Sequence, residues 1–366
     1  MKTKFLQVGL GVRGKQWAEV IRDNKDSKLV GFVTRHLEKL KERASEIGFG
    51  SVPCFDDLDQ AIEESDANVL VLVTPPEVHL EQAMKGFENG LHLLAEKPLT
   101  EDLPESIDIV KEAKEKGLKT GISMNFRYLA PSQAIRRKVI DLELGKPSFS
   151  QFTYLRHRDG RRDDLNDYPM YMENPMLLEQ SVHHLDLMRY CFNSDVESVQ
   201  ADTWNPEWST YEGDSNVSVL LKFENGMHVN YLGTWTSGSN RLYFRWRTDF
   251  PEGTLVQKRQ FYDLYQSNFD EDLPLTGKNF KESKDVEPLE ELDLPDVEAF
   301  IDDSKELLRR FLGSINDNES FETNAKDHVK TLCVVRACVE SAEDGRRIKM
   351  KDFYEENGVP TSWHSS

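Results

Sequence analysis

The chain has 366 residues, of which 38% are hydrophobic and 30% are charged, and its formal net charge is −19. This composition is typical of a folded globular protein, and the length favours two domains over one. The strong negative charge argues against nucleic acid as a partner, because binding to phosphate backbones needs a concentrated basic surface.

The targeting and cysteine patterns predict a protein of the cytoplasm. The N-terminal residues MKTKFLQVGLG contain no apolar stretch of signal-peptide length, and no apolar run is long enough to span a membrane. The four cysteines form no C-x-x-C pair, and three of them lie inside apolar runs. We therefore expect buried free thiols rather than disulfides, and no membrane partner.

Short apolar runs alternate with segments of helical periodicity in the first third of the chain. The runs are nearly continuously apolar, as buried parallel strands are, and they cover residues 4–8, 28–33, 68–74, 91–96 and 118–124. Between them, apolar residues such as Trp17, Val20 and Ile21 recur at helical spacing. This alternation predicts an α/β, doubly wound parallel sheet, a Rossmann domain over residues 1–124.

The first of these strands leads into the turn VGLGVRG, in which three glycines have the G-x-G-x-x-G spacing. We expect Gly9 to permit the tight turn, Gly11 to let the backbone approach a pyrophosphate, and Gly14 to allow close packing of helix on strand. The position of the motif between a strand and a helix predicts a dinucleotide cofactor. The alternative is a glycine-rich turn without a ligand.

The end of the second strand bears on the choice of cofactor. Thr34, Arg35 and His36 stand where NAD enzymes carry an acidic residue that binds the ribose hydroxyls. An arginine at this place can pair bidentately with a 2′-phosphate, which a carboxylate would repel. The pattern favours NADP over NAD, and an Arg35 that only stacks on the adenine would be compatible with either.

The sequence pattern changes after residue 125. Alternating strands predict one mostly antiparallel sheet, at residues 149–155, 196–204, 215–223, 226–235 and 241–246. Helical segments precede, interrupt and follow these strands, at residues 130–145, 176–192, 296–315 and 325–345. We therefore predict an α+β second domain over residues 125–366, with the acidic stretch 268–296 as a solvated loop.

Two motifs follow predicted strands of the first domain, VTPPEVHLEQA from residue 73 and AEKP from residue 95. Ligands of open α/β sheets bind at the carboxyl ends of the strands, so we expect Lys97 beside the nicotinamide. A lysine there can donate a hydrogen bond to, or exchange a proton with, a hydroxyl that is being oxidised. The alternative is a plain salt bridge between Glu96 and a neighbouring cation.

The predicted helix at 176–192 supplies a second set of polar residues. Glu179, His183 and Asp186 stand at i, i+4 and i+7, so they share one face, while apolar residues line another. A histidine flanked by carboxylates has the chemistry of a general base, and the alternative is a solvated charged face. His183 and His184 are adjacent and point about 100° apart, which argues against a metal site.

These motifs together resemble the Gfo/Idh/MocA family of oxidoreductases over nearly the whole chain. The resemblance rests on the ordered segments VGLGVRG, VTPPEVHLEQA, EKPL, NFRYLAP and LLEQSVHHLDL. It implies a C-terminal domain with an open-faced sheet and NAD(P)-linked oxidation of sugars, sugar derivatives or cyclitols. It further implies a catalytic Lys97, a cis Lys97–Pro98 bond and, on the family's Asp-x-Gly-x-His pattern, catalytic roles for His183 and Glu179. Glu179 replaces Asp and Ser181 replaces Gly, so the substrate can differ from inositol or glucose.

The motifs and the resemblance lead to three sets of expected site residues. The catalytic set is Lys97, Glu179 and His183. We expect the cofactor to contact Gly9, Gly11, Val12, Arg13, Gly14, Thr34, Arg35, His36, Thr74, Pro75, His79, Glu96, Lys97 and Asn125. We expect the substrate to contact Lys97, Arg127, Arg156, Glu179, His183 and His184. With His157, Arg161 and Arg162, the arginines would favour an acidic sugar unless they form salt bridges.

The sequence is also compatible with two other functions, and it predicts an oligomer. The scaffold could serve an NAD-dependent, redox-neutral glycosidase or a non-catalytic nucleotide-sensing regulator. Strands 227–235 and 242–247 carry aromatic residues at alternate positions, which predicts a sheet face that the chain's own helices leave open. A second copy would cover this face, so we expect a homodimer or homotetramer through the second-domain sheet, with Trp235 at the interface. The alternative is that the acidic segment folds over the sheet.

Overall fold

The computed structural model describes residues 2–158, 160–161, 168–269 and 289–364. The chain divides into two compact units, the first made of residues 1–128, 298–333 and 354–366 and the second of residues 129–297 and 334–353. The first boundary lies close to the predicted one. The division differs from the predicted second domain over 125–366, because two C-terminal segments of that range belong to the first unit.

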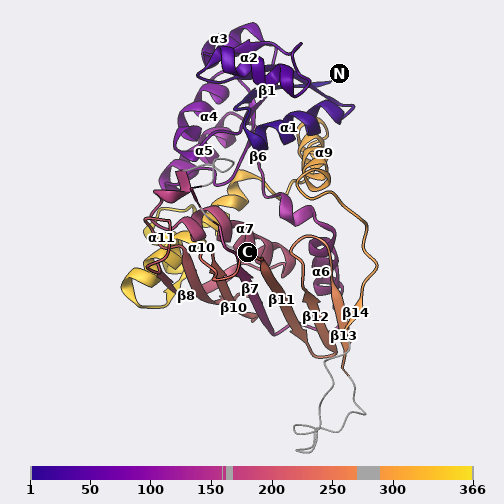
Figure 1. The fold of residues 1–366 in the computed structure, drawn as a ribbon, viewed down its shortest axis with the longest axis vertical. Coiled ribbons are helices and arrows are strands. Elements are labelled where there is room, and N and C mark those ends of the chain that lie inside the picture. Colours follow the sequence, from indigo (N-terminus) through magenta and orange to yellow (C-terminus); the bar gives the residue numbers. More distant parts are fainter. Residues whose placement is uncertain (1, 159, 162–167, 270–288, 365–366) are drawn as a thin grey trace, which may run out of the picture. The chain divides into compact units, whose positions relative to one another are not determined.

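The first unit is built on a six-stranded sheet of order β3-β2-β1-β4-β5-β6 (Figure 1). Every neighbouring pair is parallel, which confirms the doubly wound Rossmann sheet. The two-residue β3 was not predicted, because it is too short to show a periodic pattern. The strands are β1 Thr3–Val8, β2 Ser27–Val33, β3 Cys54–Phe55, β4 Val69–Leu72, β5 His92–Ala95 and β6 Thr120–Ile122.

Helices on this sheet bury apolar faces, and two of them begin at a capping aspartate. The helices and 3-10 turns are α1 Val12–Asp23, α2 Leu37–Glu46, α3 Leu58–Glu64, η1 Pro76–Val78, α4 His79–Glu88, α5 Leu103–Glu115, η2 Asn125–Tyr128, α9 Asp302–Asn316 and α12 Thr361–His364. The Asp57 and Asp102 side chains cap α3 and α5 by accepting backbone N–H groups. Helix α9 returns to this unit because Leu308 and Phe311 complete the core around Phe5. Helices α10 Ala325–Asp344 and α11 Met350–Glu356 have residues in both units.

The second unit is built on a nine-stranded sheet of order β14-β13-β12-β11-β7-β10-β9-β8-β15. The sheet is mostly antiparallel, as predicted, and its β7–β10 pair is parallel. The strands are β7 Phe149–Leu155, β8 Val196–Trp204, β9 Asn216–Phe223, β10 His228–Thr234, β11 Tyr243–Phe250, β12 Gly253–Gln257, β13 Tyr265–Asn268, β14 Glu290–Glu291 and β15 Ile348–Lys349. The last four were not predicted. Of the predicted acidic loop, residues 270–288 lie outside the described residues, and its ends contribute to β13 and β14.

The helices of this unit cover the aromatic face of the sheet, which corrects the prediction that this face is open. They are α6 Ala130–Asp141, the short η3 Tyr168–Met170, the π-helix η4 Met176–Ser181 and α7 Val182–Cys191. Phe152 pairs in register with Tyr231 and Trp246, and its ring lies 4.7 Å from that of His184 on α7. The predicted interface residue Trp235 is only 1% exposed. The opposite face presents mainly polar side chains and the half-exposed Leu220.

Candidate functional site

The glycine-rich turn has the geometry that a bound pyrophosphate requires. Gly9 has a φ of +95°, and a Cβ there would lie 2.3 Å from the Val73 carbonyl oxygen. A Cβ at Gly14 would lie 2.6 Å from the Gly9 oxygen, so the helix packs closely on the strand. A Cβ at Gly11 would meet no atom within 4 Å. Gly11 precedes α1 without a side-chain cap, and no acidic residue lies in the first turn, so the helix N-terminus suits an anion.

Arg13, which follows Gly11 by two residues, binds protein groups with its whole side chain. Its Nε lies 2.8 Å from Glu96 Oε1, and its Nη atoms donate to Gln16, Ser123, Ser304 and the Phe300 carbonyl. These contacts use all five N–H donors of the guanidinium. The contact of this side chain with the cofactor stays a prediction, and for a hydrogen bond to a phosphate only the backbone N–H of Arg13 remains.

Glu96 is the carboxylate partner of this arginine. It also accepts a 2.7 Å hydrogen bond from Trp17 Nε1. Burial alone would raise the pKa of Glu96, but the Arg13 charge and the hydrogen bonds from Trp17, Arg13 and Ser123 outweigh it and hold this pKa below its usual range. The Glu96 side chain thus forms a half-buried ion pair that joins α1 to the end of β5, and its contact with the cofactor stays a prediction.

Lys97 directly follows this pair, on the loop after β5. The Lys97–Pro98 bond is cis, which confirms the expectation from the resemblance, and the Lys97 side chain is half-buried. Buried His79 lies below this loop, with Nδ1 2.8 Å from the Leu99 oxygen and Nε2 2.9 Å from the Thr74 oxygen. Both ring nitrogens contact protein carbonyls, so the contact between His79 and the cofactor stays a prediction without a polar atom of the ring to carry it. Burial lowers the pKa of His79 against the opposing effect of the two carbonyls.

Asn125 also turns its side chain toward the protein. Its Nδ2 donates a 2.5 Å hydrogen bond to Asp303 Oδ2, at the start of α9. Burial raises the pKa of Asp303 to about 6, although Asn125 and Arg13 act in the opposite direction. The sequence offered no sign of this contact, because Asp303 is remote in the chain and looks like an ordinary acid of a helix first turn.

The remaining predicted cofactor residues lie at the carboxyl ends of β2 and β4, apart from Val12, which begins α1. Arg35 and His36 are exposed, and the Thr34 hydroxyl accepts the His36 backbone N–H at 3.3 Å. Among the described residues, Arg35 forms no ion pair with a carboxylate. Thr74 donates its hydroxyl to Gln82, Pro75 is exposed, and Val12 is 70% exposed beside the glycine turn.

In the second unit, the segment with Glu179 and His183 begins as a π-helix rather than as the predicted single α-helix. Glu179 accepts a 2.7 Å hydrogen bond from the Tyr168 hydroxyl, and His183 is buried. Asp186 is also buried, and its Oδ1 lies 3.9 Å from Arg189 Nη1. The alternative of a solvated charged face is therefore wrong for His183 and Asp186, because the whole of α7 is buried, whereas Glu179 precedes α7 and is half-buried.

His184 lies in the core of the second unit, which corrects its predicted contact with the substrate. Its ring is fully buried, and burial lowers its pKa to about 3. Its Nε2 lies 3.2 Å from the Gln180 amide nitrogen, so it accepts, and its Nδ1 donates to the Tyr231 hydroxyl at 2.9 Å. Tyr231 in turn lies 2.8 Å from Ser181 Oγ. His184 thus fixes the packing of α7 on the sheet.

The positively charged residues that were predicted to favour an acidic sugar differ in their burial and in their partners. Arg127 is buried in the first unit, where it pairs with Asp327 and donates to the Glu322 carbonyl. The structure confirms the alternative of a salt bridge, and the contact of Arg127 with the substrate stays a prediction. Arg156 is half-buried beside Tyr154, His157 and Arg161 are exposed, and Arg162 lies outside the described residues.

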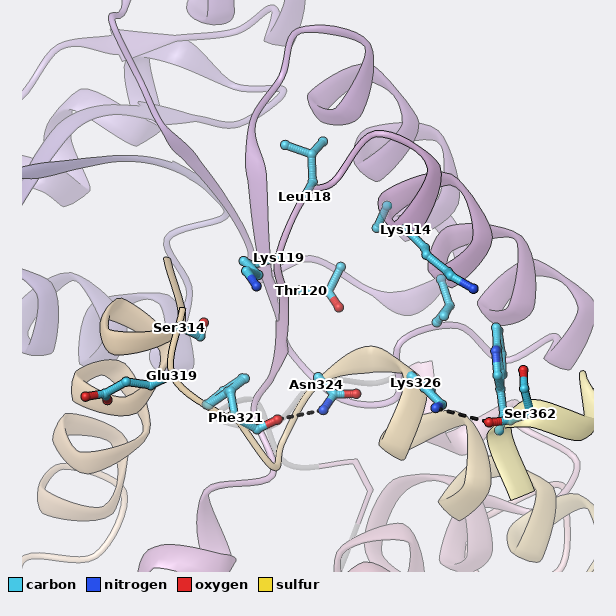
Figure 2. Close-up of a pocket in the computed structure, with 13 residues that line it drawn as sticks. Lys114, Leu118, Lys119, Thr120, Ser314, Glu319, Phe321, Asn324, Lys326 and Ser362 are labelled. Carbon is cyan, nitrogen blue, oxygen red and sulfur yellow. Dashed lines mark hydrogen bonds between the residues drawn. The ribbon is translucent and has the colours of Figure 1, made fainter. Parts of the chain in front are cut away.

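A separate pocket of about 520 Å³ lies within the first unit (Figure 2). Its lining includes Lys114 at the end of α5, Thr120 at the start of β6, and Lys326 in the first turn of α10. Lys326 Nζ lies 3.4 Å from the Ser362 carbonyl oxygen. Thr120 marks the amino end of its strand, whereas the glycine turn and Lys97 follow carboxyl ends. None of the predicted site residues lines this pocket.

Comparisons with known proteins agree with this geometry. The Gfo/Idh/MocA model described as an oxidoreductase family with an NAD-binding Rossmann fold matches residues 3–125, and the GFO/IDH/MocA C-terminal domain matches residues 132–256. An uncharacterized protein of Sinorhizobium fredii is 24% identical over 99% of each chain. Inositol 2-dehydrogenase of Mycolicibacterium smegmatis is 28% identical, over 61% of this chain and 63% of that enzyme.

A solved structure shows the same fold over nearly the whole chain. Levoglucosan dehydrogenase, in complex with NADH and levoglucosan, is 18% identical and has a TM-score of 0.81. The match covers 96% of this chain and all of the other. In the part of this chain that the structure describes, no helix combines the length and apolarity of a membrane span.

Proposed function

This chain belongs to the Gfo/Idh/MocA family of oxidoreductases, and we propose that it transfers a hydride between a nicotinamide dinucleotide and a secondary alcohol of a sugar, sugar derivative or cyclitol. The observation that carries this proposal is the shared edge of the first unit's sheet. The turn at Gly11, which suits an anion, follows β1, and Lys97 follows β5. Both therefore lie at carboxyl ends of strands, where open α/β sheets bind their ligands.

The cofactor supplies the redox chemistry, because its nicotinamide takes up or returns the hydride. The chain's own residues then have two tasks. The backbone N–H groups of Val12 and Arg13 and the dipole of α1 hold the pyrophosphate. Lys97 donates a hydrogen bond to the reacting hydroxyl and exchanges its proton, and we assign His183 as the general base, with Glu179 four residues before it in the sequence. The open space at Gly11 and the absence of acid in the first turn of α1 fit this cofactor.

The substrate class rests on the printed activities of relatives, which include dehydrogenases of inositol and of glucose 6-phosphate. An acidic sugar is not favoured, because Arg127, one of the arginines that were predicted to favour it, already pairs with Asp327. We assign NADP as the preferred cofactor on the exposure of Arg35 and the lack of an acidic residue beside it. Among the described residues, Arg35 has no carboxylate partner that it would have to give up in order to pair with a 2′-phosphate.

We still propose a homo-oligomer that forms through the sheet of the second unit, but through its other face. The aromatic patch that suggested it is covered by helices, but Leu220, 48% exposed on β9, and Tyr243, 51% exposed on β11, lie on the other face. A two-fold copy would bury such a face against itself.

The proposal is tested with a panel of neutral sugars, uronic acids and cyclitols, each with NAD⁺ and NADP⁺, read at the nicotinamide absorbance. Lys97→Ala should lower kcat on any substrate found by roughly 10²–10⁴, the range of general acid–base catalysis, with cofactor binding unchanged. Lys114→Ala is the matched control, because Lys114 lines the pocket at the amino end of β6 in the same unit. A Lys97→Ala enzyme with the wild-type rate would refute the assignment. Glycoside cleavage without NAD(P)H release would instead indicate a redox-neutral glycosidase, and tight cofactor binding with no turnover a regulator.

A further inference from the structure

The loop that carries Lys97 is held at one residue, Leu99, by two buried histidines from distant parts of the chain. The Leu99 backbone N–H donates to His328 Nε2 at 3.2 Å, and His79 Nδ1 lies 2.8 Å from the Leu99 carbonyl oxygen. All three residues are at most 1% exposed. His79 begins α4 and His328 lies in the first turn of α10, so two helices meet the loop at one peptide.

The sheet cannot satisfy these backbone groups, because β5 ends at Ala95 and the chain has left the ladder before Leu99. A buried backbone N–H or C=O without a partner costs as much as a lost hydrogen bond, so side chains must supply the partners. Since an N–H donates to it, Nε2 of His328 is unprotonated and its proton is on Nδ1. His79 lies between two carbonyl oxygens, with Nε2 2.9 Å from the Thr74 oxygen, so a neutral ring, which carries a single N–H, donates to only one of them at a time.

We infer that His79 and His328 are positioning residues, which fix the loop after β5 so that the Lys97 ammonium stands in a defined place for proton exchange. This inference rests on the proposed function. Proton transfer demands a hydrogen-bond geometry, and a displacement of about 1 Å far from the chemistry can lower a rate about 10²-fold. Lys97 is two residues from the point that the histidines hold, and a loop without this hold would leave its side chain spread over several positions.

The two histidines offer a test in which the same pair of substitutions has opposite effects. The amide of Asn reaches the position of a histidine Nδ1, whereas the amide of Gln reaches that of Nε2. His79→Asn therefore keeps a donor for the Leu99 oxygen alone, and His79→Gln keeps one for the Thr74 oxygen alone, so this pair tests whether the bond to Leu99 is the one that matters. At the other position, His328→Gln keeps an acceptor for the Leu99 N–H, and His328→Asn falls short of it.

We expect kcat within about 3-fold of wild type for His79→Asn and His328→Gln, and a loss of roughly 10- to 100-fold for His79→Gln and His328→Asn. The Kd for NADPH, followed by its fluorescence, should stay unchanged in all four variants. A loss of general stability would not follow this crossed pattern. Equal effects of Asn and Gln at both positions, or a crossed effect on the Kd alone, would overturn the inference.

Hydrogen exchange separates a failure of this inference from a failure of the proposed function. The peptide that contains the Leu99 amide should exchange faster in His328→Asn than in His328→Gln or wild type, whether or not a substrate is known. If no compound of the panel is turned over, the proposed function fails and exchange alone decides whether the histidines hold the loop. If the variants at one position do not fold, as melting curves would show, the pair at the other position decides the question.

Discussion

Replacing Asp303 with Asn should stabilise the protein more at high pH than at low pH. Asp303 is 3% exposed, and its pKa is raised from 3.8 to about 6. A raised pKa means that the fold favours the protonated carboxyl, so wild type loses stability as the pH rises through about 6. The difference of about 2.2 pKa units corresponds to about 3 kcal/mol once ionisation is complete. Roughly 1.6 kcal/mol of this is already lost at pH 5, which leaves about 1.4 kcal/mol between pH 5 and pH 8.

Thermal unfolding of wild type and variant at pH 5, 6, 7 and 8 measures this effect. For a unit of this size, 1.4 kcal/mol corresponds to about 3–6 °C, so the melting temperature of Asp303→Asn relative to wild type should rise by that amount from pH 5 to pH 8. Asp302→Asn is the matched control, because hydrogen bonds from the Glu298 backbone and Lys305 lower the pKa of Asp302 and leave it ionised throughout this range. A difference for Asp303→Asn that stays constant with pH would refute the reasoning.

Three further predictions concern other parts of the molecule. Arg13→Lys should destabilise the first unit by about 1–3 kcal/mol, because a lysine has three donors instead of five and leaves the half-buried Glu96 and other acceptors poorly paired; a melting temperature equal to wild type would contradict this. Arg35→Asp should raise the KM for NADP more than that for NAD in steady-state kinetics, since it replaces a phosphate partner with a like charge, whereas Lys114→Asp, with the same charge change, should shift neither. Leu220→Asp should shift an oligomer toward the 42.2 kDa of one chain in light scattering, and wild type at that mass would refute the assembly.

The sequence alone determined the features that depend on local pattern. The parallel strands of the first unit are apolar runs of characteristic length, and β7 and β8 occupy the predicted residues. The turn from Gly9 to Gly14 was predictable because its spacing reflects backbone conformation and close approach within one supersecondary unit. Lys97 could be placed at the carboxyl end of a strand because parallel strands all end at the same edge of a sheet.

Only the tertiary structure decided which polar side chains face the protein and which remain for ligands. His183 and His184 look alike in sequence, yet His184 is held among core aromatic rings and hydrogen-bonded there. Arg13 was predicted to contact the cofactor, but its guanidinium donates to the Phe300 carbonyl, 287 positions away, and to Ser304 on α9. The open face of the second sheet was assigned wrongly because period-two aromatics mark a buried face without saying what buries it. Burial and long-range partners are properties of the packed chain, and no local spacing encodes them.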